Sequence, residues 1–273
     1  MRRILTVAVL LSVFSMGIPV TLRAVHRRFF GVKPGVTLEG RRMEGYYGRE
    51  VWVIVEQLAA NIQRPPKRAG VHKETGEIIP HENGIYVDID ATVNQVLHAP
   101  KRAELKVQTV EIVPDVRTEH LEGLTAILGD FSTPVMGSPA RVNNIRLSLE
   151  AINNTLVLPG EVFSFNGVVG ERTPEKGYRN APIILGEAVV PGVGGGICQT
   201  STTLYNAVRA AGLEIVERRI HSIAPSYIQH GRDATVAWPH TDFKFRNNSD
   251  HPVIVKAGIQ GWRVRVWIVG RKD

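Results

Sequence analysis

The stretch from Gly192 to Ser222 constrains the fold more than any other part of the chain. It reads GVGGGICQTSTTLYNAVRAAGLEIVERRIHS, and the only cysteine of the sequence, Cys198, directly follows the glycine run. After the cysteine, apolar side chains recur at helical spacing: Leu204, Val208 and Ala211. Gly212 is typical of a helix end. The alternating segment LEIVERRI then predicts a strand that leads into His221.

The segments after His221 decide the fold class. They contain APSYIQHGRDATVAW, HTDFKFRNNSDHPVIVKAGIQ and WRVRVWIVG, and the last two predict an antiparallel hairpin with turns at 247–250 and 258–261. Strands therefore follow the cysteine-bearing helix in succession, rather than alternating with helices. This order favours an α+β fold over a parallel βαβ sheet.

A long amphipathic helix is expected before this region. Ser138 followed by Pro139 is typical of a helix N-cap and first turn. Apolar residues then recur at helical spacing: Val142, Ile145, Leu149, Ile152 and Leu156. Pro159-Gly160 turns the chain into the expected strand EVFSFN, and IILGEAVVPGVGGG supplies another strand and the glycine loop. We predict an α+β domain over residues 131–270, with the cysteine-bearing helix packed on a mainly antiparallel sheet.

The N-terminus predicts a membrane anchor in residues 1–28. Arg2 and Arg3 precede an uncharged apolar run, Ile4–Leu22, which is at the lower length limit for crossing a bilayer. Such a run is either a retained anchor or a signal peptide, and no clean small-x-small cleavage site lies near its end. We expect a single-pass anchor in the cell membrane with the bulk of the chain outside the cytoplasm. The alternative is secretion after cleavage.

The region between the apolar run and residue 137 predicts a linker, a small domain and a connection. Residues 29–48 are rich in glycine and charge and indicate a linker. Residues 49–118 predict a small α+β domain, with one helix ended by Pro65 and a second following Asp90. This part has no cysteine, no paired carboxylates and no glycine-rich phosphate loop, so binding or spacing is favoured over chemistry. Residues 115–137 are expected to connect it to the second domain.

Composition and charge limit the partners. A chain of 273 residues with 43% hydrophobic content can bury a substantial core. The net charge of +7 favours acidic partners such as anionic lipid or cell wall, but no nucleic-acid recognition motif accompanies it. A single cysteine excludes an internal disulfide framework and a multi-cysteine zinc site. Cys198 with His221, His230 or His240 lacks the short spacings of zinc ligands, so we expect no metal and no cofactor.

Several stretches in order resemble the VanW family. They are RVNNIRLSLEAINNTLVLPGEVFSFN, VVGERTPEKGYRNAPII, the cysteine stretch itself, GRDATVAW and DFKFRNNSDHPVIV. Residues 49–118 are similar, more weakly, to the peptidoglycan-binding domain that often precedes this module, through ENGIYVDID and VEIVP. The resemblance implies a bacterial protein of the cell envelope, anchored in the membrane or exported, with peptidoglycan or its precursors as partner. It does not establish an activity.

The residues around Cys198 predict a nucleophile. The positive end of a helix lowers the pKa of a cysteine at its N-terminus and favours the thiolate. His221 is the candidate base, and Asp233 is the first candidate to orient it, followed by Asp242 and Asn247. This order resembles papain-like and transglutaminase-like cysteine enzymes in arrangement, not in sequence.

Residues near the nucleophile are candidates for substrate binding. The N–H groups of Gly195 and Gly196, with the Gln199 side chain, would form an oxyanion hole. Arginines that flank the motifs can hold the carboxylates of wall peptides: Arg172, Arg179, Arg218, Arg219 and Arg232. Of these, we select Arg219 and Arg232 as substrate-binding residues.

Two functions follow from these alternatives. The first is a cysteine-dependent acyl-transfer or amide-hydrolysing enzyme, similar to a peptidase or transpeptidase, that acts on peptidoglycan or its precursors. The second is a non-catalytic module that binds peptidoglycan or an envelope partner, in which Cys198 is a buried structural thiol.

Overall fold

The computed structural model describes residues 22–23, 25–185 and 188–272, which form two compact units. The first unit contains the described residues up to Lys67 together with Glu82–Asp115, and the second contains Arg68–His81 and the described residues from Val116 onward. The expected anchor, Ile4–Leu22, lies outside the described residues except for Leu22. Within the part that the structure describes, no helix combines the length and the apolar character needed to cross a membrane.

The first unit is built on two helices that pack together, α2 (Gly48–Ile62) and α3 (Ile89–His98). Asp88 caps α3 by accepting a hydrogen bond from the Ala91 N–H at 2.8 Å. Short strands complete the unit: β1 (Thr37–Leu38), β2 (Arg41–Arg42), β5 (Gly84–Val87), β6 (Glu104–Leu105) and β7 (Thr109–Ile112). β1 pairs antiparallel with β2 and parallel with β6, and β5 pairs antiparallel with β7.

Residues 29–48 are part of this unit rather than a linker. Val36, Leu38 and Met43 are fully buried in the same core as the apolar face of α2. The glycines that indicated a linker form turns, as at Gly35 and Gly45, which both have a positive φ. The apolar side chains between these turns supply one side of the core.

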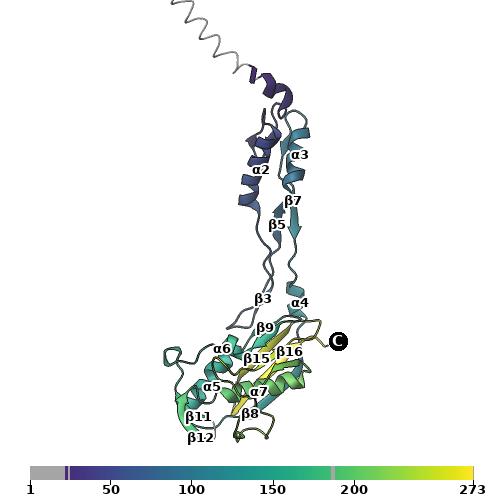
Figure 1. Cartoon of the computed structure of the whole chain (residues 1–273). Helices are drawn as coiled ribbons and strands as arrows, with labels where there is room; N and C mark the ends of the chain where they lie inside the picture. Colours follow the sequence, from purple (N-terminus) through teal and green to yellow (C-terminus); the bar gives the residue numbers. More distant parts are fainter. Residues whose placement is uncertain (1–21, 24, 186–187, 273) are drawn as a thin grey trace, which may run out of the picture. The chain divides into compact units, whose positions relative to one another are not determined.

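The second unit is organised around a four-stranded antiparallel sheet of order β8-β16-β15-β9. Its strands are β8 (Ala126–Pro134), β16 (Arg263–Gly270), β15 (Val253–Gln260) and β9 (Thr155–Val157). Alternate residues of β16, Val264, Val266 and Ile268, are fully buried, because helices α5 (Pro139–Ile152) and α7 (Ile197–Ala210) cover this face (Figure 1). The predicted α+β class is confirmed.

Smaller elements surround the sheet and helices of this unit. β13 (Glu214–Glu217), β14 (Lys244–Arg246) and β10 (Val162–Ser164) form an antiparallel sheet, while β11 (Asn180–Leu185) and β12 (Ala188–Val193) form a hairpin. The remaining elements are β3 (Gly70–Val71), β4 (Ile78–Ile79), α4 (Thr118–Glu122), α6 (Phe165–Val169) and the 3-10 helix Pro174–Lys176.

Three expectations differ from the structure in this unit. Residues 115–137 are not only a connection, since they contain α4 and the sheet strand β8. The helix that begins after Ser138 ends at Ile152, and Leu156 lies in β9 instead, because Asn154 adopts a positive φ of 56° and turns the chain. β13 ends at Glu217, so His221 lies in the loop that follows the strand rather than at its end.

Candidate active site

The glycine run brings Cys198 to the first turn of α7. Gly194 and Gly196 have φ values of 85° and 110°, which residues with side chains rarely adopt. A Cβ on Gly195 would lie 2.5 Å from the Ala181 carbonyl oxygen of β11, and one on Gly196 would lie 2.9 Å from Arg141 Cγ of α5. The loop therefore needs glycine both for its conformation and for the close approach of its neighbours.

The polar side of α7 is buried and makes several hydrogen bonds to the rest of the unit. The Gln199 amide nitrogen donates to Thr133 Oγ1 at 2.9 Å and to the Pro134 carbonyl at 2.7 Å. Ser201 donates to the Ala234 carbonyl at 2.6 Å, and the Thr200 hydroxyl lies 2.7 Å from that of Ser148. Because each lost bond would leave a buried polar group unpaired, these contacts fix the position of α7 and of Cys198 on it.

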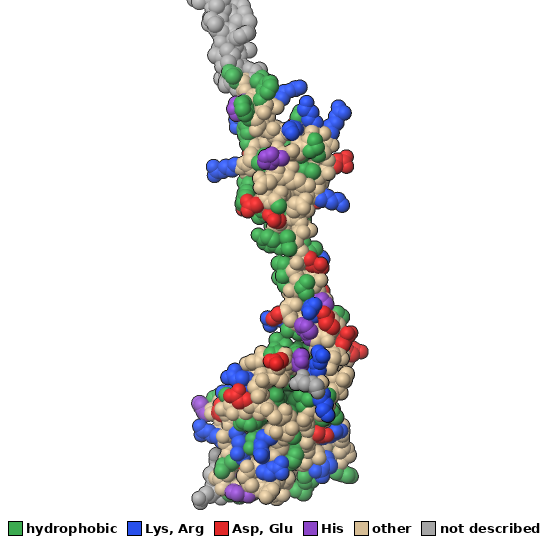
Figure 2. Space-filling view, turned by 90° about the vertical axis from the view of Figure 1, so that its right-hand side faces the viewer, with side chains coloured by type: hydrophobic (Ala, Val, Ile, Leu, Met, Phe, Trp, Pro, Cys, Tyr) green, Lys and Arg blue, Asp and Glu red, His purple; other side chains and the backbone are tan. Residues whose placement is uncertain are grey.

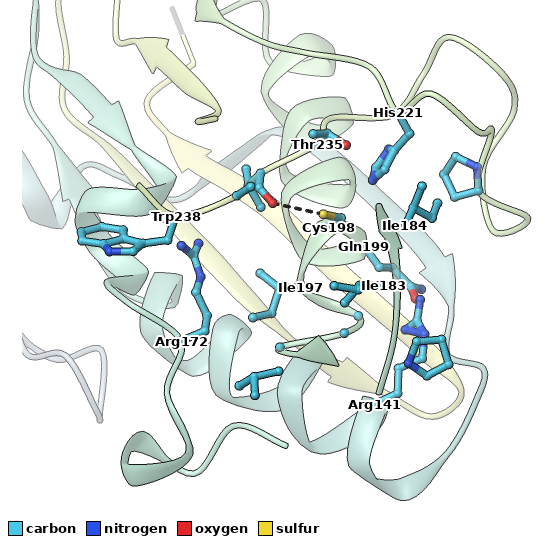
Figure 3. A pocket seen from close by; sticks show the side chains of 18 of the residues that line it. Arg141, Arg172, Ile183, Ile184, Ile197, Cys198, Gln199, His221, Thr235 and Trp238 are labelled. Atoms are coloured by element: carbon cyan, nitrogen blue, oxygen red, sulfur yellow. Dashed lines mark hydrogen bonds between the residues drawn. The ribbon is translucent and has the colours of Figure 1, made fainter. Parts of the chain in front are cut away.

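Cys198, His221 and Asp233 lie together, and hydrogen bonds join His221 to Asp233. His221 Nδ1 lies 2.6 Å from Asp233 Oδ2, and the backbone N–H of His221 donates to the same oxygen at 2.6 Å. The side chains of His221 and Asp233 are only 7% and 3% exposed. With Nδ1 held by Asp233, the imidazole points toward the Cys198 sulfur (Figure 3), and each of the two side chains shifts the pKa of the other. The thiol also lies 3.4 Å from the Val236 carbonyl.

The surroundings of Cys198, His221 and Asp233 shift the pKa of each side chain. Burial acts to raise the pKa of Cys198, but the hydrogen bond and charge of His221, together with the Arg172 guanidinium, lower the pKa below its ordinary value. Burial acts to lower the pKa of His221, but Cys198 and Asp233 raise it. Burial also acts to raise the pKa of Asp233, and its hydrogen bonds from His221 lower it. The shifts of Cys198 and His221 both favour transfer of the thiol proton to the imidazole, which would make Cys198 more reactive.

A cavity of about 410 Å³ opens over Cys198. Its polar lining includes His221, Gln199, Arg141, Arg172 and Tyr227, and Trp238 contributes a partly exposed ring. The β11–β12 hairpin and the glycine run complete its wall: Pro182, Ile183, Ile184, Val193, Gly194, Gly195 and Gly196. In the part of the chain that the structure describes, no group of three His, Cys, Asp or Glu side chains is arranged to hold a metal ion.

Some of the other predicted site residues line the cavity and some do not. Gly195, Gly196 and Gln199 line the cavity, but the Gln199 amide nitrogen is already bound to Thr133 and Pro134, so it does not serve as an oxyanion donor. Arg219 and Arg232, expected to bind substrate, do not line the cavity. Arg232 donates instead to Asn206 Oδ1 at 3.1 Å, and its guanidinium lies over the Phe131 ring.

The two further candidates for orienting His221 have other roles. Asp242 accepts hydrogen bonds from the Ser164 hydroxyl and from the N–H groups of Asn166 and Phe243, which ties α6 to the segment before β14. Asn247 donates to the carbonyls of Val157 and His251 and shapes the turn before β15. Asp233 is therefore the acidic residue that contacts His221.

Arg141 lines the cavity, although the sequence pattern did not indicate it as a site residue. It lies in the first turn of α5, where it fits the polar face of an amphipathic helix. Only the packing of α5 against Gly196 brings its guanidinium to the cavity. Arg172 was one of several arginines near the motifs, and the structure separates it from the others because it lines the cavity.

The comparisons with known proteins concern this part of the chain. Residues 140–269 match the family described as VanW like protein. A Bacillus subtilis (strain 168) protein, the uncharacterized protein YoaR, is 40% identical over 209 residues, which cover 75% of this chain and 69% of that protein. The chain belongs to the VanW family. No solved structure matches it.

A second relative carries a functional name. The vancomycin B-type resistance protein VanW of Enterococcus faecalis (strain ATCC 700802 / V583) is 30% identical over 115 residues, 40% of this chain and 42% of that protein. The VanW-family match contains Cys198, His221, Asp233, Arg141 and Arg172, so the whole candidate site belongs to the shared domain. The peptidoglycan-binding domain expected over residues 49–118 stays a prediction.

Proposed function

We propose that this VanW-family protein is a cysteine-dependent acyl-transfer or amide-hydrolysing enzyme that acts on peptidoglycan or its precursors. The observation that carries the proposal is that Cys198 and His221 line one cavity, where hydrogen bonds to Asp233 hold His221 beside the thiol. A buried structural thiol needs neither a histidine oriented by a carboxylate nor a pKa lowered against the effect of its own burial.

The reaction would proceed through a thioester. The Cys198 thiolate attacks the carbonyl carbon of a substrate amide and forms a C–S bond, and the carbonyl oxygen takes the negative charge. His221 gives its proton to the leaving amine as the C–N bond breaks. Water or a second amine then attacks the thioester, His221 takes the proton of the attacking group, and the thiolate is released. Asp233 keeps the imidazole in the orientation and tautomer that both steps require.

The N-terminus of α7 would stabilise the oxyanion. The carbonyl oxygens of Gly194 and Gly196 accept hydrogen bonds from the N–H groups of Ile197 and Gln199, so these two donors are not available to a substrate. The Cys198 N–H and the positive end of the helix dipole remain to face charge that develops next to the sulfur.

An envelope location and a wall substrate are supported by three facts. The name of the Enterococcus faecalis relative refers to resistance to an antibiotic, vancomycin. The apolar run Ile4–Leu22 suits an anchor or signal peptide, with the bulk of the chain outside the cytoplasm. The net charge of +7 suits contact with an anionic polymer, and on the face shown in Figure 2 the Lys and Arg side chains are scattered rather than collected in one patch.

The thioester gives a direct test. Purified protein is mixed with soluble peptidoglycan fragments, quenched in acid and analysed by intact mass spectrometry. We expect an adduct on the wild type that hydroxylamine removes, no adduct on Cys198→Ala, and slow formation on His221→Ala. Products released by the wild type and absent with Cys198→Ala identify the bond that is cleaved.

The binding-module alternative makes the opposite prediction. Equal binding of wild type and Cys198→Ala to purified sacculi, with neither an adduct nor a product from any fragment, would contradict the enzyme proposal.

A further inference from the structure

Two arginines in the cavity have buried guanidinium nitrogens without a hydrogen-bond partner. Among the described residues, Arg141 Nη1 and both Nη1 and Nη2 of Arg172 are buried and unpaired. Burial lowers the pKa of both side chains, yet a guanidinium keeps its proton at any physiological pH. Because an unpaired charge is costly to bury, this arrangement is typical of a site that is completed by an anion.

The protein holds these arginines against the loop that carries the nucleophile. A Cβ on Gly196 would lie 3.0 Å from Arg141 Nη1, and one on Gly194 would lie 3.4 Å from Arg172 Cβ. The Arg141 guanidinium lies over the Tyr227 ring, 5.8 Å from its centroid, and the Arg172 guanidinium lies over the Phe165 ring at 5.7 Å. These rings contact the cations but do not replace a hydrogen-bond acceptor for the unpaired N–H groups.

The thiolate does not account for both charges. The thiolate acts on both arginines and Asp242 acts on Arg172, but neither accepts a hydrogen bond from the buried guanidinium nitrogens. The remaining acid of the cavity lining, Glu171, is exposed and is not the partner of the Arg172 nitrogens. In Figure 3 the two arginines lie on different sides of Cys198, Arg172 beside Trp238 and Arg141 on the side of Gln199.

Gln199 adds an acceptor on the Arg141 side. Its Oε1 is buried and unpaired. The orientation of the amide is fixed, because its nitrogen donates to the Pro134 carbonyl, which can only accept. An N–H group of a ligand can therefore bind Oε1 while a neighbouring carboxylate binds Arg141.

We propose that Arg141 and Arg172 are carboxylate-binding residues, which place substrate carboxylates on two sides of the Cys198 sulfur. The substrate class is then amino-acid or peptide material with free carboxylates, and on the Arg141 side a carboxylate next to an N–H donor. This inference rests on the proposed function, because it names the substrate of the same site. Binding of a carboxylate to the arginines can nevertheless be measured without turnover.

Two alkylating reagents of nearly equal size provide the test. Iodoacetate and iodoacetamide both lose iodide to the Cys198 thiolate and leave an S–CH₂ product, but only iodoacetate carries a carboxylate. Both rate constants contain the same fraction of thiolate at one pH, so this fraction drops out of their ratio. We expect a wild-type ratio well above that of glutathione in the same buffer, with iodoacetate rates that saturate. Arg172→Gln or Arg141→Gln should lower the ratio about tenfold, the usual effect of losing one charged hydrogen bond.

Matched variants separate binding from other effects. Arg209→Gln changes an exposed arginine at the far end of α7 and should leave the ratio unchanged. If Arg172 only stabilises the thiolate, its replacement slows both reagents equally, and the constant ratio overturns its role as a carboxylate site. A ratio that neither cavity variant changes, in proteins with wild-type circular dichroism, overturns the whole proposal.

A second probe removes the dependence on the reagent. N-acetyl-D-alanine should protect Cys198 from iodoacetamide, and its C-terminal amide should protect much less. Equal protection by the acid and the amide contradicts the carboxylate sites. A protein that fails to form thioesters but keeps these preferences contradicts the proposed enzyme while retaining the sites, so the two proposals fail separately.

Discussion

Helices α2 and α7 have nearly the same length but bury different chemistry. The 15 residues of α2 bury four apolar side chains, Val51, Ile54, Val55 and Ala59, and leave the opposite side to solvent. The 14 residues of α7 bury eleven, six of which are polar: Gln199, Thr200, Ser201, Thr202, Thr203 and Asn206. α2 is held mainly by apolar contact, with one ion pair between Glu50 and Arg27, whereas α7 is also held by several buried hydrogen bonds.

The two kinds of contact differ in how strictly they fix the position of a helix. Apolar packing fixes a helix on its partner but tolerates small shifts, because dispersion and burial have little direction. Hydrogen bonds of 2.6–2.9 Å from Gln199 and Ser201 fix both the rotation and the translation of α7. The stricter attachment of α7 suits the proposed function, in which Cys198 must stay within reach of His221.

The largest stability effect should come from α2. Ile54→Ala removes a buried side chain from the core of the first unit and should cost about 2–5 kcal/mol in urea unfolding, which circular dichroism can follow. The rate of Cys198 alkylation should stay at the wild-type value, because α2 and Cys198 belong to different units. A large change in that rate would show that the first unit acts on the site.

Asp233→Asn should have the next largest effect, on reactivity. The amide no longer raises the pKa of His221, so the imidazolium loses its proton at lower pH and supports the Cys198 thiolate less. The pH at which iodoacetamide alkylation reaches half its maximum should therefore move upward. The rate near about pH 6 should fall roughly tenfold, as for a displacement of one pKa unit.

The stability of the Asp233 variant has a defined pH dependence. The pKa of Asp233 is lowered, so its contribution is present at neutral pH and is lost as the pH falls through the folded-state value. The pKa of His221 is raised, so its contribution is lost as the pH rises through its own folded-state value. Wild type and Asp233→Asn should thus differ most in melting temperature between these two values. An unshifted alkylation profile would contradict the assigned role of Asp233.

The sequence grouped Cys198, His221 and Asp233, which the structure also brings together, but it indicated only part of the cavity lining around them. The glycine run and the helix after it mark Cys198, and the residue types in IHS and GRDATV mark His221 and Asp233. Their catalytic role stays a prediction. Arg141 leaves no such pattern. Its approach to the cavity depends on how α5 packs on Gly196, which is a contact between distant segments.

The strand β8 was missed for a similar reason. Its segment AILGDFSTP is interrupted by Gly129, which ordinarily weakens a strand. In the structure this glycine allows α7 to approach the sheet, because a Cβ there would clash with the Ala207 carbonyl and with Ala211. The same logic applies to residues 29–48, where glycine-rich turns concealed a part of the core. In both places glycine marks a close approach or a turn inside a domain.

The smallest effect on stability should come from Thr203→Val, which replaces a polar side chain of α7 by an apolar one. The opposite replacement in α2, Val55→Thr, is its matched comparison. Thr203→Val keeps the shape but removes the hydroxyl that lies 2.9 Å from Thr133 Oγ1, and should cost about 0.5–1.5 kcal/mol. Val55→Thr places a hydroxyl in the apolar core of the first unit, where no hydrogen-bond partner lies beside it. It should lower the free energy of unfolding by about 1–3 kcal/mol. Urea unfolding measures both. If Thr203→Val were stabilising, apolar packing would hold α7 as well as its hydrogen bonds do. The buried polar face would then have its value in positioning Cys198, which a slower alkylation rate in the same variant would reveal.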